Sequence, residues 1–184
     1  MLTEELTRKA QNIKLLVLDV DGVLTDGTLV YSEDGERVKH FNVKDGVGIK
    51  LLQRFDVAVA IISAKDSLPL TRRIQDLAIK HAYTGCHDKL LALQELTAKL
   101  GIQLHEVAYC GDDVIDLKVM QRVGLSLAPA DAYVMVREYA HVVTQAAGGK
   151  GVAREVADLI LASRMDLKQA YIKAMLPEFE NKAL

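Results

Sequence analysis

Four short apolar runs rich in β-branched residues constrain the fold of this chain most: residues 15–20, 57–62, 106–110 and 123–127. Helical patterns occupy residues 46–55, 68–78, 89–100 and 116–122. Short buried strands that alternate with amphipathic helices are typical of βαβ units. The sequence therefore predicts an α/β fold, a doubly wound, Rossmann-like parallel sheet with helices on both faces. Residues 81–83 and 141–143 are expected to add short strands, and residues 152–162 a last helix.

One segment interrupts this alternation directly after the first predicted strand, where a doubly wound fold would begin a helix. Residues 28–43 carry β-prone residues on both sides of Asp34-Gly35, and Asp-Gly is a strong turn signal. We therefore expect a β-hairpin over residues 28–43. The 184 residues are expected to form one domain, 1–184. Residues 163–184 are interpreted as a C-terminal tail that is either mobile or packs on a partner.

Composition and net charge limit the kinds of partner that the chain is expected to bind. The formal net charge of -2 gives no general electrostatic case for nucleic acid, and no apolar run approaches the ~18 residues of a membrane span. The N-terminal residues lack the apolar core of a signal peptide. The two cysteines, Cys86 and Cys110, have no metal-type spacing and are expected to be reduced thiols. We therefore expect a cytoplasmic protein with neither nucleic acid nor membrane as partner.

Chemically active side chains follow the predicted strands. In an open parallel sheet, ligands bind beyond the carboxyl ends of the strands. Carboxylates, one hydroxyl and one ammonium occupy these positions: Asp19, Asp21, Ser63, Lys89, Asp112, Asp113 and Asp116. Carboxylates that face one another repel, and a bound divalent cation is the usual compensation. An all-oxygen donor set favours Mg²⁺ as that cation.

This set of residues suits phosphoryl transfer. A carboxylate such as Asp19 can attack phosphorus and form an acyl phosphate. Asp21, two residues on, can protonate the leaving oxygen and later deprotonate the attacking water, provided that burial or neighbouring charge retains its proton. Ser63 and Lys89 can hold the equatorial oxygens. Each residue alone has a plain alternative as a helix cap, turn or surface residue, but their joint occurrence at strand ends favours the phosphatase interpretation.

The same residues resemble the four motifs of haloacid dehalogenase superfamily phosphatases: residues 19–25, Ser63, Lys89 and residues 111–116. Residues 21–27, 44–48, 111–117 and 148–155 further resemble one family within it, the 3-deoxy-D-manno-octulosonate (Kdo) 8-phosphate phosphatases. This resemblance extends over about residues 15–161. It implies Mg²⁺-dependent hydrolysis of Kdo 8-phosphate to Kdo and inorganic phosphate through an aspartyl-phosphate intermediate, in lipopolysaccharide biosynthesis.

The resemblance also implies a role for each motif residue. Asp19 would be the nucleophile and Asp21 the general acid/base. Asp19, Asp112 and the main-chain carbonyl of Asp21 would bind Mg²⁺. The other motif residues would bind phosphate or support the acidic cluster: Ser63, Lys89, Asp113 and Asp116. The family lacks a large cap domain and forms a homotetramer in which hairpins like residues 28–43 pair around the centre, with a neighbouring subunit partly covering each active site.

The substrate side departs from the family pattern. The family usually has Gly-Arg after the motif serine, whereas this chain has Ala64-Lys65. Lysine keeps the charge but lacks the planar fork that binds a carboxylate bidentately. The substrate-binding candidates are Thr25, Lys65, Ser67, Arg72 and Arg154. Arg72 has the alternative of a solvated helix position, and Arg154 that of an ion pair with Glu155 or Asp158.

Three other functions remain open from the sequence. A related phosphatase acting on a nine-carbon sugar acid 9-phosphate would share the same motifs. A receiver-like phospho-switch also surrounds Mg²⁺ with acidic residues, but it places its phosphoacceptor after the third strand. A non-catalytic assembly module is the third, because similar domains are fused to sugar nucleotide transferases.

Overall fold

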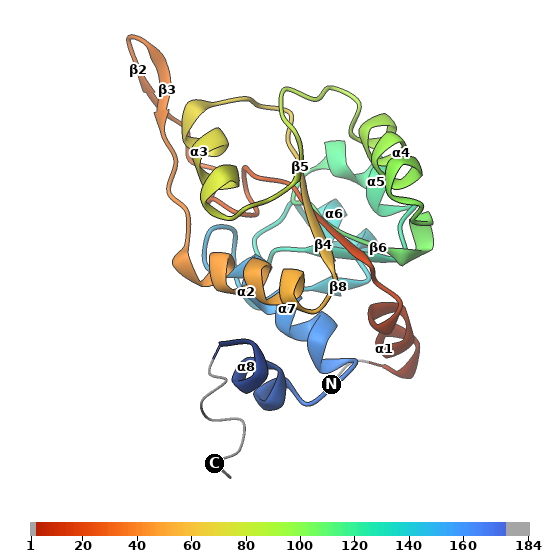
Figure 1. Ribbon diagram of the computed structural model, residues 1–184. Coiled ribbons are helices and arrows are strands. Elements are labelled where there is room, and N and C mark those ends of the chain that lie inside the picture. Colours follow the sequence, from red (N-terminus) through yellow and green to blue (C-terminus); the bar gives the residue numbers. More distant parts are fainter. Residues whose placement is uncertain (1–2, 176–184) are drawn as a thin grey trace.

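The computed structural model describes residues 3–175 and contains a six-stranded parallel sheet in the order β5-β4-β1-β6-β7-β8 (Figure 1). Its strands are β1 (Leu15–Leu18), β4 (Ala58–Ile62), β5 (His81–Tyr83), β6 (Val107–Cys110), β7 (Leu125–Ala128) and β8 (Val142–Val143). From central β1 the chain builds one side of the sheet through β4 and β5, then crosses to β6 and continues outward. The predicted doubly wound α/β fold is confirmed.

Helices cover both faces of the sheet. They are α1 (Glu4–Gln11), α2 (Val43–Arg54), α3 (Leu68–Asp76), α4 (Lys89–Leu100), α5 (Leu117–Met120), α6 (Val134–Tyr139), α7 (Val152–Ala162) and α8 (Leu167–Met175). Helices α1, α2, α3, α7 and α8 contribute to one hydrophobic cluster, and α4, α5 and α6 to the other. No helix of the described residues is both long and apolar enough to cross a bilayer.

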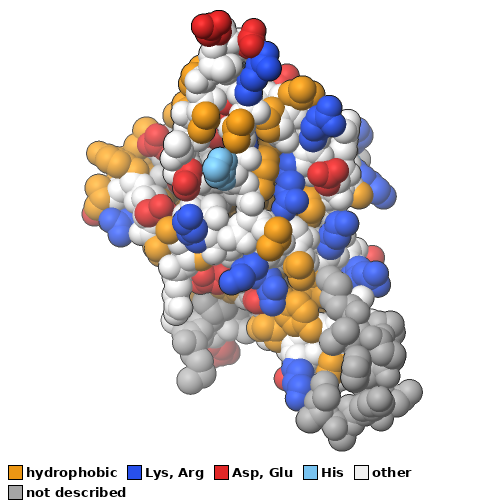
Figure 2. Space-filling view, turned by 90° about the vertical axis from the view of Figure 1, so that its left-hand side faces the viewer, with side chains coloured by type: hydrophobic (Ala, Val, Ile, Leu, Met, Phe, Trp, Pro, Cys, Tyr) orange, Lys and Arg blue, Asp and Glu red, His pale blue; other side chains and the backbone are white. Residues whose placement is uncertain are grey.

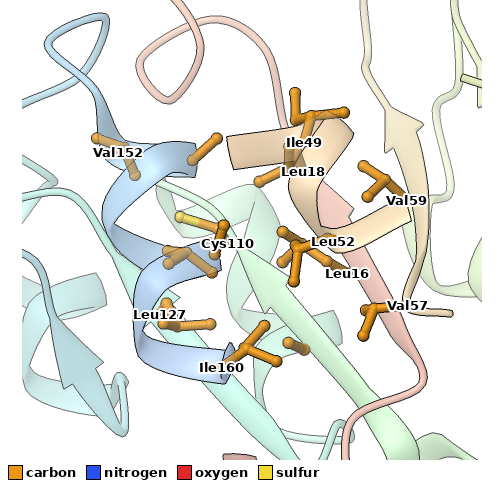
Figure 3. Packing of buried hydrophobic residues seen from close by; sticks show 14 of the residues in the cluster. Leu16, Leu18, Ile49, Leu52, Val57, Val59, Cys110, Leu127, Val152 and Ile160 are labelled. Carbon is orange, nitrogen blue, oxygen red and sulfur yellow. The ribbon is translucent and has the colours of Figure 1, made fainter. Parts of the chain in front are cut away.

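Alternation along β1 divides the core between the two faces. Leu16 and Leu18 enter the first cluster, whereas Leu15 and Val17 enter the second. Figure 3 shows the first cluster, where Leu18 and side chains from α2, β6 and α7 interdigitate. Burial of each large aliphatic side chain stabilises the fold by about 1.5–3 kcal/mol. The central strand is therefore fixed from both sides, and so is the loop that leaves it.

Helices α2 and α7 pack closely at residues 44–48, the motif near the start of α2. A Cβ on Gly48 would lie 2.7 Å from the Cα of Arg154. The Asp45 carboxylate accepts a hydrogen bond of 3.1 Å from the Arg154 N–H at the start of α7, where a helix has unsatisfied N–H groups. This motif therefore joins two helices, and both Asp45 and Gly48 are buried in that joint.

The segment that precedes α7 supports the loop after β1. Gly149 N–H donates to the carbonyl of Val23 at 3.0 Å, and Gly148 N–H donates to the Asp131 carboxylate at 2.8 Å. A Cβ on Gly148 would lie 2.2 Å from the carbonyl oxygen of Gly22. The glycines at 148 and 149 thus allow one loop to lie directly on the other.

The predicted hairpin is present between β1 and α2. Antiparallel strands β2 (Val30–Ser32) and β3 (Gly35–Val38) project from the body of the molecule (Figure 1). Gly35 has φ +93°, a conformation that suits glycine in a tight turn. Acidic side chains lie at the tip of the projecting hairpin, and hydrophobic side chains lie below them (Figure 2). On the hairpin strands, Tyr31 is 64% exposed and Val38 is 43% exposed.

Several element boundaries differ from the sequence expectation. Helix α2 begins at Val43 rather than at residue 46, because the Asn42 side chain accepts the Lys44 N–H and caps it. The helix expected over residues 116–122 is instead a 3₁₀ turn, Val114–Asp116, followed by the short α5. Helices α1 and α6 were not predicted.

The segment expected as a C-terminal tail is in part a helix. Residues 167–175 form α8, which packs on α7. Ala170, Ile172 and Ala174 are buried there, and Tyr171 donates a hydrogen bond to the Asp158 carboxylate. This burial makes an ordered helix more favourable than a solvated tail. Residues 176–184 lie outside the described part of the chain.

Candidate active site

The register of the sheet brings the predicted strand-end residues together. Leu18 pairs with Ile61 of β4 and with Cys110 of β6, so Asp19 lies level with the ends of both neighbours. Strands β1 and β6 are adjacent and parallel, but the chain passes from β1 to β4 on one side and from β6 to β7 on the other. This divergence of the connections is a topological switch point. A cleft of about 260 Å³ opens there, lined by Asp19, Asp21, Gly27, Ser63, Ala64, Lys65, Lys89, Asp112, Asp113 and Ile115.

A larger hollow of about 430 Å³ lies at the opposite end of the strands, beside Ala58 and His81. Asp56 is the one carboxylate in its lining. The cleft beyond the carboxyl ends is therefore the better candidate site, since it collects the acidic, hydroxyl and ammonium groups in one place.

Lys89 is the central cation of the cleft. Its Nζ lies 2.9 Å from Asp19 Oδ2 and 2.7 Å from Asp116 Oδ1, and its side chain is 4% exposed. Burial by itself lowers the pKa of this ammonium, but the two carboxylates outweigh it and raise the pKa overall. Lys89 therefore stays charged at the floor of the site.

Asp116 is fully buried, and both of its oxygens are engaged. Oδ1 accepts hydrogen bonds from Lys89 Nζ at 2.7 Å and from the Tyr109 hydroxyl at 2.6 Å. Oδ2 accepts the main-chain N–H groups of Asp112 and Asp113 at 3.1 and 3.3 Å. Asp116 thus orients Lys89 and fixes the loop that carries Asp112. Tyr109 has no counterpart in the sequence interpretation.

Three carboxylates converge. One oxygen each from Asp19, Asp112 and Asp116 lies within 4.8 Å of the others. Burial first, then the charge of Asp116, raises the pKa of Asp19 to about 6, although Lys89 opposes this. Burial, followed by the charges of Asp19 and Asp116, raises the pKa of Asp112 to about 7. These shifts mark an excess of negative charge.

The donor set fits a hard divalent cation. Protein donors occupy both oxygens of Asp116. The carboxylates of the cluster that are left to face a ligand are therefore those of Asp19 and Asp112. Oxygen donors with uncompensated charge suit Mg²⁺. The expected contribution of the Asp21 main-chain carbonyl stays a prediction.

Gly22 allows the loop after β1 to lie close to Asp112 in the loop after β6. It has φ +88°, and a Cβ there would lie 2.0 Å from Asp112 Oδ2. A side chain at this position would both strain the backbone and occupy the space of the carboxylate. Glycine between Asp21 and Val23 is therefore a requirement of the site.

Ser63 follows β4 and lies in the cleft wall. Its N–H donates to the Tyr83 carbonyl at 2.9 Å, and its Oγ accepts the Lys65 N–H at 3.2 Å. The residue is 1% exposed. Ser63 is thus anchored in the wall of the cleft that Lys89 also lines, and its phosphate-binding role stays a prediction.

Asp21 has a partner that sequence reasoning missed. Lys39 Nζ lies 2.5 Å from Asp21 Oδ1 and 2.6 Å from Glu36 Oε1, and the Lys39 side chain is 1% exposed. The Thr25 hydroxyl also donates to Asp21 Oδ1, at 3.4 Å. The separation of 18 residues between Asp21 and Lys39 gives no sequence signal for this pair. Thr25, a substrate-binding candidate, here supports the loop.

Of the substrate-side candidates, Lys65 lines the cleft and Ser67 does not. The Lys65 Nζ is 3.3 Å from the Tyr31 hydroxyl and 5.5 Å from the centre of that ring. The hairpin therefore reaches the rim of the site. Ser67 precedes α3, and its buried Oγ has no hydrogen-bond partner among the described residues.

The remaining two candidates lie elsewhere. Arg72 is exposed and lines a separate hollow with hairpin residues Asp34 and Glu36. Arg154 Nε donates to the Asp158 carboxylate at 3.0 Å, and its guanidinium stacks 4.6 Å from the Tyr171 ring. Arg154 thus makes the ion pair that was its structural alternative.

Comparisons with known proteins identify the family of this chain. A model of haloacid dehalogenase-like hydrolases matches residues 82–156. The 3-deoxy-D-manno-octulosonate 8-phosphate phosphatase of Yersinia pestis is 46% identical over 92% of this chain and 90% of its own length.

Solved structures extend the similarity to the whole fold. The Moraxella catarrhalis 3-deoxy-D-manno-octulosonate 8-phosphate phosphatase, in complex with magnesium, phosphate and Kdo, is 37% identical with a TM-score of 0.87, and the match covers 96% of this chain and 99% of that one. The cobalt-bound Haemophilus influenzae enzyme is 41% identical with a TM-score of 0.86, covering 93% and 98%.

Proposed function

The chain belongs to the haloacid dehalogenase-like hydrolases, in the family of the 3-deoxy-D-manno-octulosonate 8-phosphate phosphatases, and we propose that it hydrolyses Kdo 8-phosphate to Kdo and inorganic phosphate. The reaction serves lipopolysaccharide biosynthesis. The observation that carries the proposal is the Asp19–Lys89–Asp116 arrangement beside Asp112, in a chain 46% identical to a named phosphatase.

Asp19 is the nucleophile of this mechanism. A carboxylate oxygen of Asp19 attacks phosphorus, and the bond between phosphorus and the sugar oxygen breaks as the aspartyl phosphate forms. Asp21 gives its proton to the leaving sugar oxygen. Asp21 then takes a proton from the water that attacks the aspartyl phosphate, which frees Asp19 and inorganic phosphate.

The other residues hold the transferred group. Lys89 and the Ser63 hydroxyl bind the phosphoryl oxygens, where fixed donors stabilise developing charge. Asp19, Asp112 and the main-chain carbonyl of Asp21 would hold Mg²⁺, which would neutralise charge between nucleophile and phosphate. Lys65, which lines the cleft, is the proposed contact for the carboxylate of the sugar.

The proposal is tested by phosphate release from Kdo 8-phosphate and a panel of phosphorylated sugar acids, with Mg²⁺ or with a chelator. Preference for Kdo 8-phosphate and dependence on Mg²⁺ are expected. Equal rates on eight-carbon and nine-carbon acids would overturn the narrow assignment. A phosphoenzyme that persists for minutes would favour a phospho-switch, and no turnover of any phosphate would favour an assembly module.

The proposal includes a homotetramer assembled through the hairpin and located in the cytoplasm. Four hydrophobic residues around the hairpin are more than 40% exposed: Leu29, Val30, Tyr31 and Val38. Contiguous exposed apolar side chains on a short two-stranded sheet suit a contact between copies. The free thiols of Cys86 and Cys110 suit a reducing compartment.

A further inference from the structure

Lys39 contacts the general acid/base of the proposed reaction without reaching the cleft. Its ammonium lies 2.5 Å from Asp21 Oδ1. The cleft lining includes Asp21 but not Lys39. Lys39 therefore lies outside the cleft lining, and the proposed effect on the reaction passes through Asp21.

The contact leaves one oxygen of Asp21 free. Both hydrogen bonds that the described residues make to this carboxylate, from Lys39 Nζ and from the Thr25 hydroxyl, end on Oδ1. The bond from Thr25 is long, at 3.4 Å, so the ammonium is the main restraint. A carboxyl group that is anchored through one oxygen presents the other in a fixed direction.

Lys39 is itself held by the hairpin. Its Nζ lies 2.6 Å from Oε1 of Glu36 on β3, whose side chain is 8% exposed. That Glu36 oxygen makes no well-directed hydrogen bond in the described part of the chain, whereas the bond from Lys39 to Asp21 is well directed. Glu36 therefore balances the buried charge, while the donor points at Asp21.

We propose that Lys39 is a positioning residue for Asp21: it anchors Oδ1 so that Oδ2 faces the leaving oxygen of the substrate, and through Glu36 it makes this orientation depend on the hairpin. The role rests on the proposed phosphatase function. This positioning role differs from a purely structural one, because it affects the transfer of a proton to the leaving oxygen and not the binding of phosphate.

The test compares two leaving groups in the full chain with Mg²⁺. The sugar oxygen of Kdo 8-phosphate needs a proton to leave, whereas nitrophenolate from p-nitrophenyl phosphate leaves as a stabilised anion. The parameter kcat/KM reports the steps up to formation of the aspartyl phosphate. Lys39→Met is expected to lower kcat/KM for Kdo 8-phosphate by about tenfold or more, a part of the ~10²–10⁴-fold that general acid–base catalysis contributes. For p-nitrophenyl phosphate the value should stay within about threefold.

Three further variants separate positioning from folding. Lys39→Arg, which keeps the charge, should restore most of the activity on Kdo 8-phosphate. Lys50→Met removes an exposed lysine of α2 and should behave as wild type. In an Asp21→Asn background, Lys39→Met should have no additional effect, because its route of action is gone. If Lys39→Met does not fold, Lys39→Gln replaces it in the same comparison.

The outcomes distinguish the two proposals. Equal losses on both substrates, no loss on either, or a full additional loss in the Asp21→Asn background would overturn the role of Lys39 and leave the phosphatase function standing. A wild-type chain that hydrolyses no alkyl phosphate would overturn the proposed function and this role with it.

Discussion

In the proposed mechanism, the role of Asp19 depends on its neighbours Lys89, Asp112 and Asp116 as well as on its place after β1. We predict that Asp19→Asn abolishes turnover and leaves the fold intact, because the amide is nearly isosteric but a poor nucleophile. Phosphate release should fall to background, while circular dichroism and the midpoint of thermal unfolding stay at or above wild type. Wild-type rates from this variant would remove Asp19 from the mechanism.

The charge of the acidic cluster makes cation binding depend on pH. Without a cation, burial and mutual repulsion raise the pKa of Asp19 to about 6 and that of Asp112 to about 7. Protons therefore compete with Mg²⁺, and the apparent affinity is expected to weaken as the pH falls from 8 through 7 to 6. Calorimetric titration in two buffers of different ionisation enthalpy should detect proton release near pH 6.5. An affinity independent of pH over this range would contradict the prediction.

At the scale of single residues, the sequence predicted the site residues that belong to motifs. It missed the residues that reach the site only through the fold. Asp19, Ser63 and Asp112 follow strands, and the parallel register places them together. Lys39 contacts Asp21, and Tyr109 contacts Asp116, from positions that carry no motif of their own. Such contacts depend on tertiary packing, which a single sequence does not encode in local spacing.

The joint between α2 and α7 sets the position of the loops around the site. We predict that Gly48→Ala destabilises the protein by up to about 2 kcal/mol net, because overlap of the new methyl with the α7 backbone costs about 1–3 kcal/mol. This cost exceeds the roughly 1 kcal/mol gained from the better helix propensity of alanine. Urea unfolding measures the difference, and Val47→Ala, at an exposed position of the same helix, is the control. A more stable Gly48→Ala variant would refute the close contact.

Asp45 makes the same joint sensitive to pH. Burial raises its pKa from 3.8 to about 6, although the N–H groups of Arg154 and Ala153 oppose this. Its folded-state pKa is above the unfolded value, so ionised Asp45 disfavours the folded state. The cost appears as the pH rises from about 4 and is fully present above 6.

Asp45→Asn removes this charge and keeps an oxygen for the Arg154 N–H. The free energy of unfolding of the variant, relative to wild type, is predicted to rise by on the order of 2 kcal/mol between pH 4 and pH 8. Denaturant titrations at both pH values, in the same buffer with a chelator, give this difference. A constant difference would show that Asp45 has an ordinary pKa.

Most elements were predictable because their signals are local. Helix α4 and strand β5 have the predicted bounds, and the hairpin follows from its Asp-Gly turn. The short α6 and the terminal α1 and α8 were missed, because tertiary contacts stabilise them more than their own patterns do. Helix α8, for example, is anchored by Tyr171 on Asp158.

For the molecule as a whole, the hairpin is the expected site of assembly. The wild-type chain is predicted to sediment as a tetramer, and Val30→Asp to dissociate it, because a charge on the exposed apolar hairpin opposes its burial between copies. Leu91→Asp, at an exposed position of α4, is the matched control and should remain tetrameric. Sedimentation velocity distinguishes these species. A monomeric wild type would contradict the assembly.

The volume of the cleft has a consequence for inhibitor discovery. At about 260 Å³, it is smaller than the ~300–1,000 Å³ of pockets that enclose drug-sized ligands. Fragments that fill it will be small anions that mimic phosphate, and these will bind equally to other enzymes with the same acidic cluster. Selective compounds must therefore extend outward to the rim, where Lys65 and Tyr31 meet. Screening should use the protein in the oligomeric state that sedimentation velocity finds.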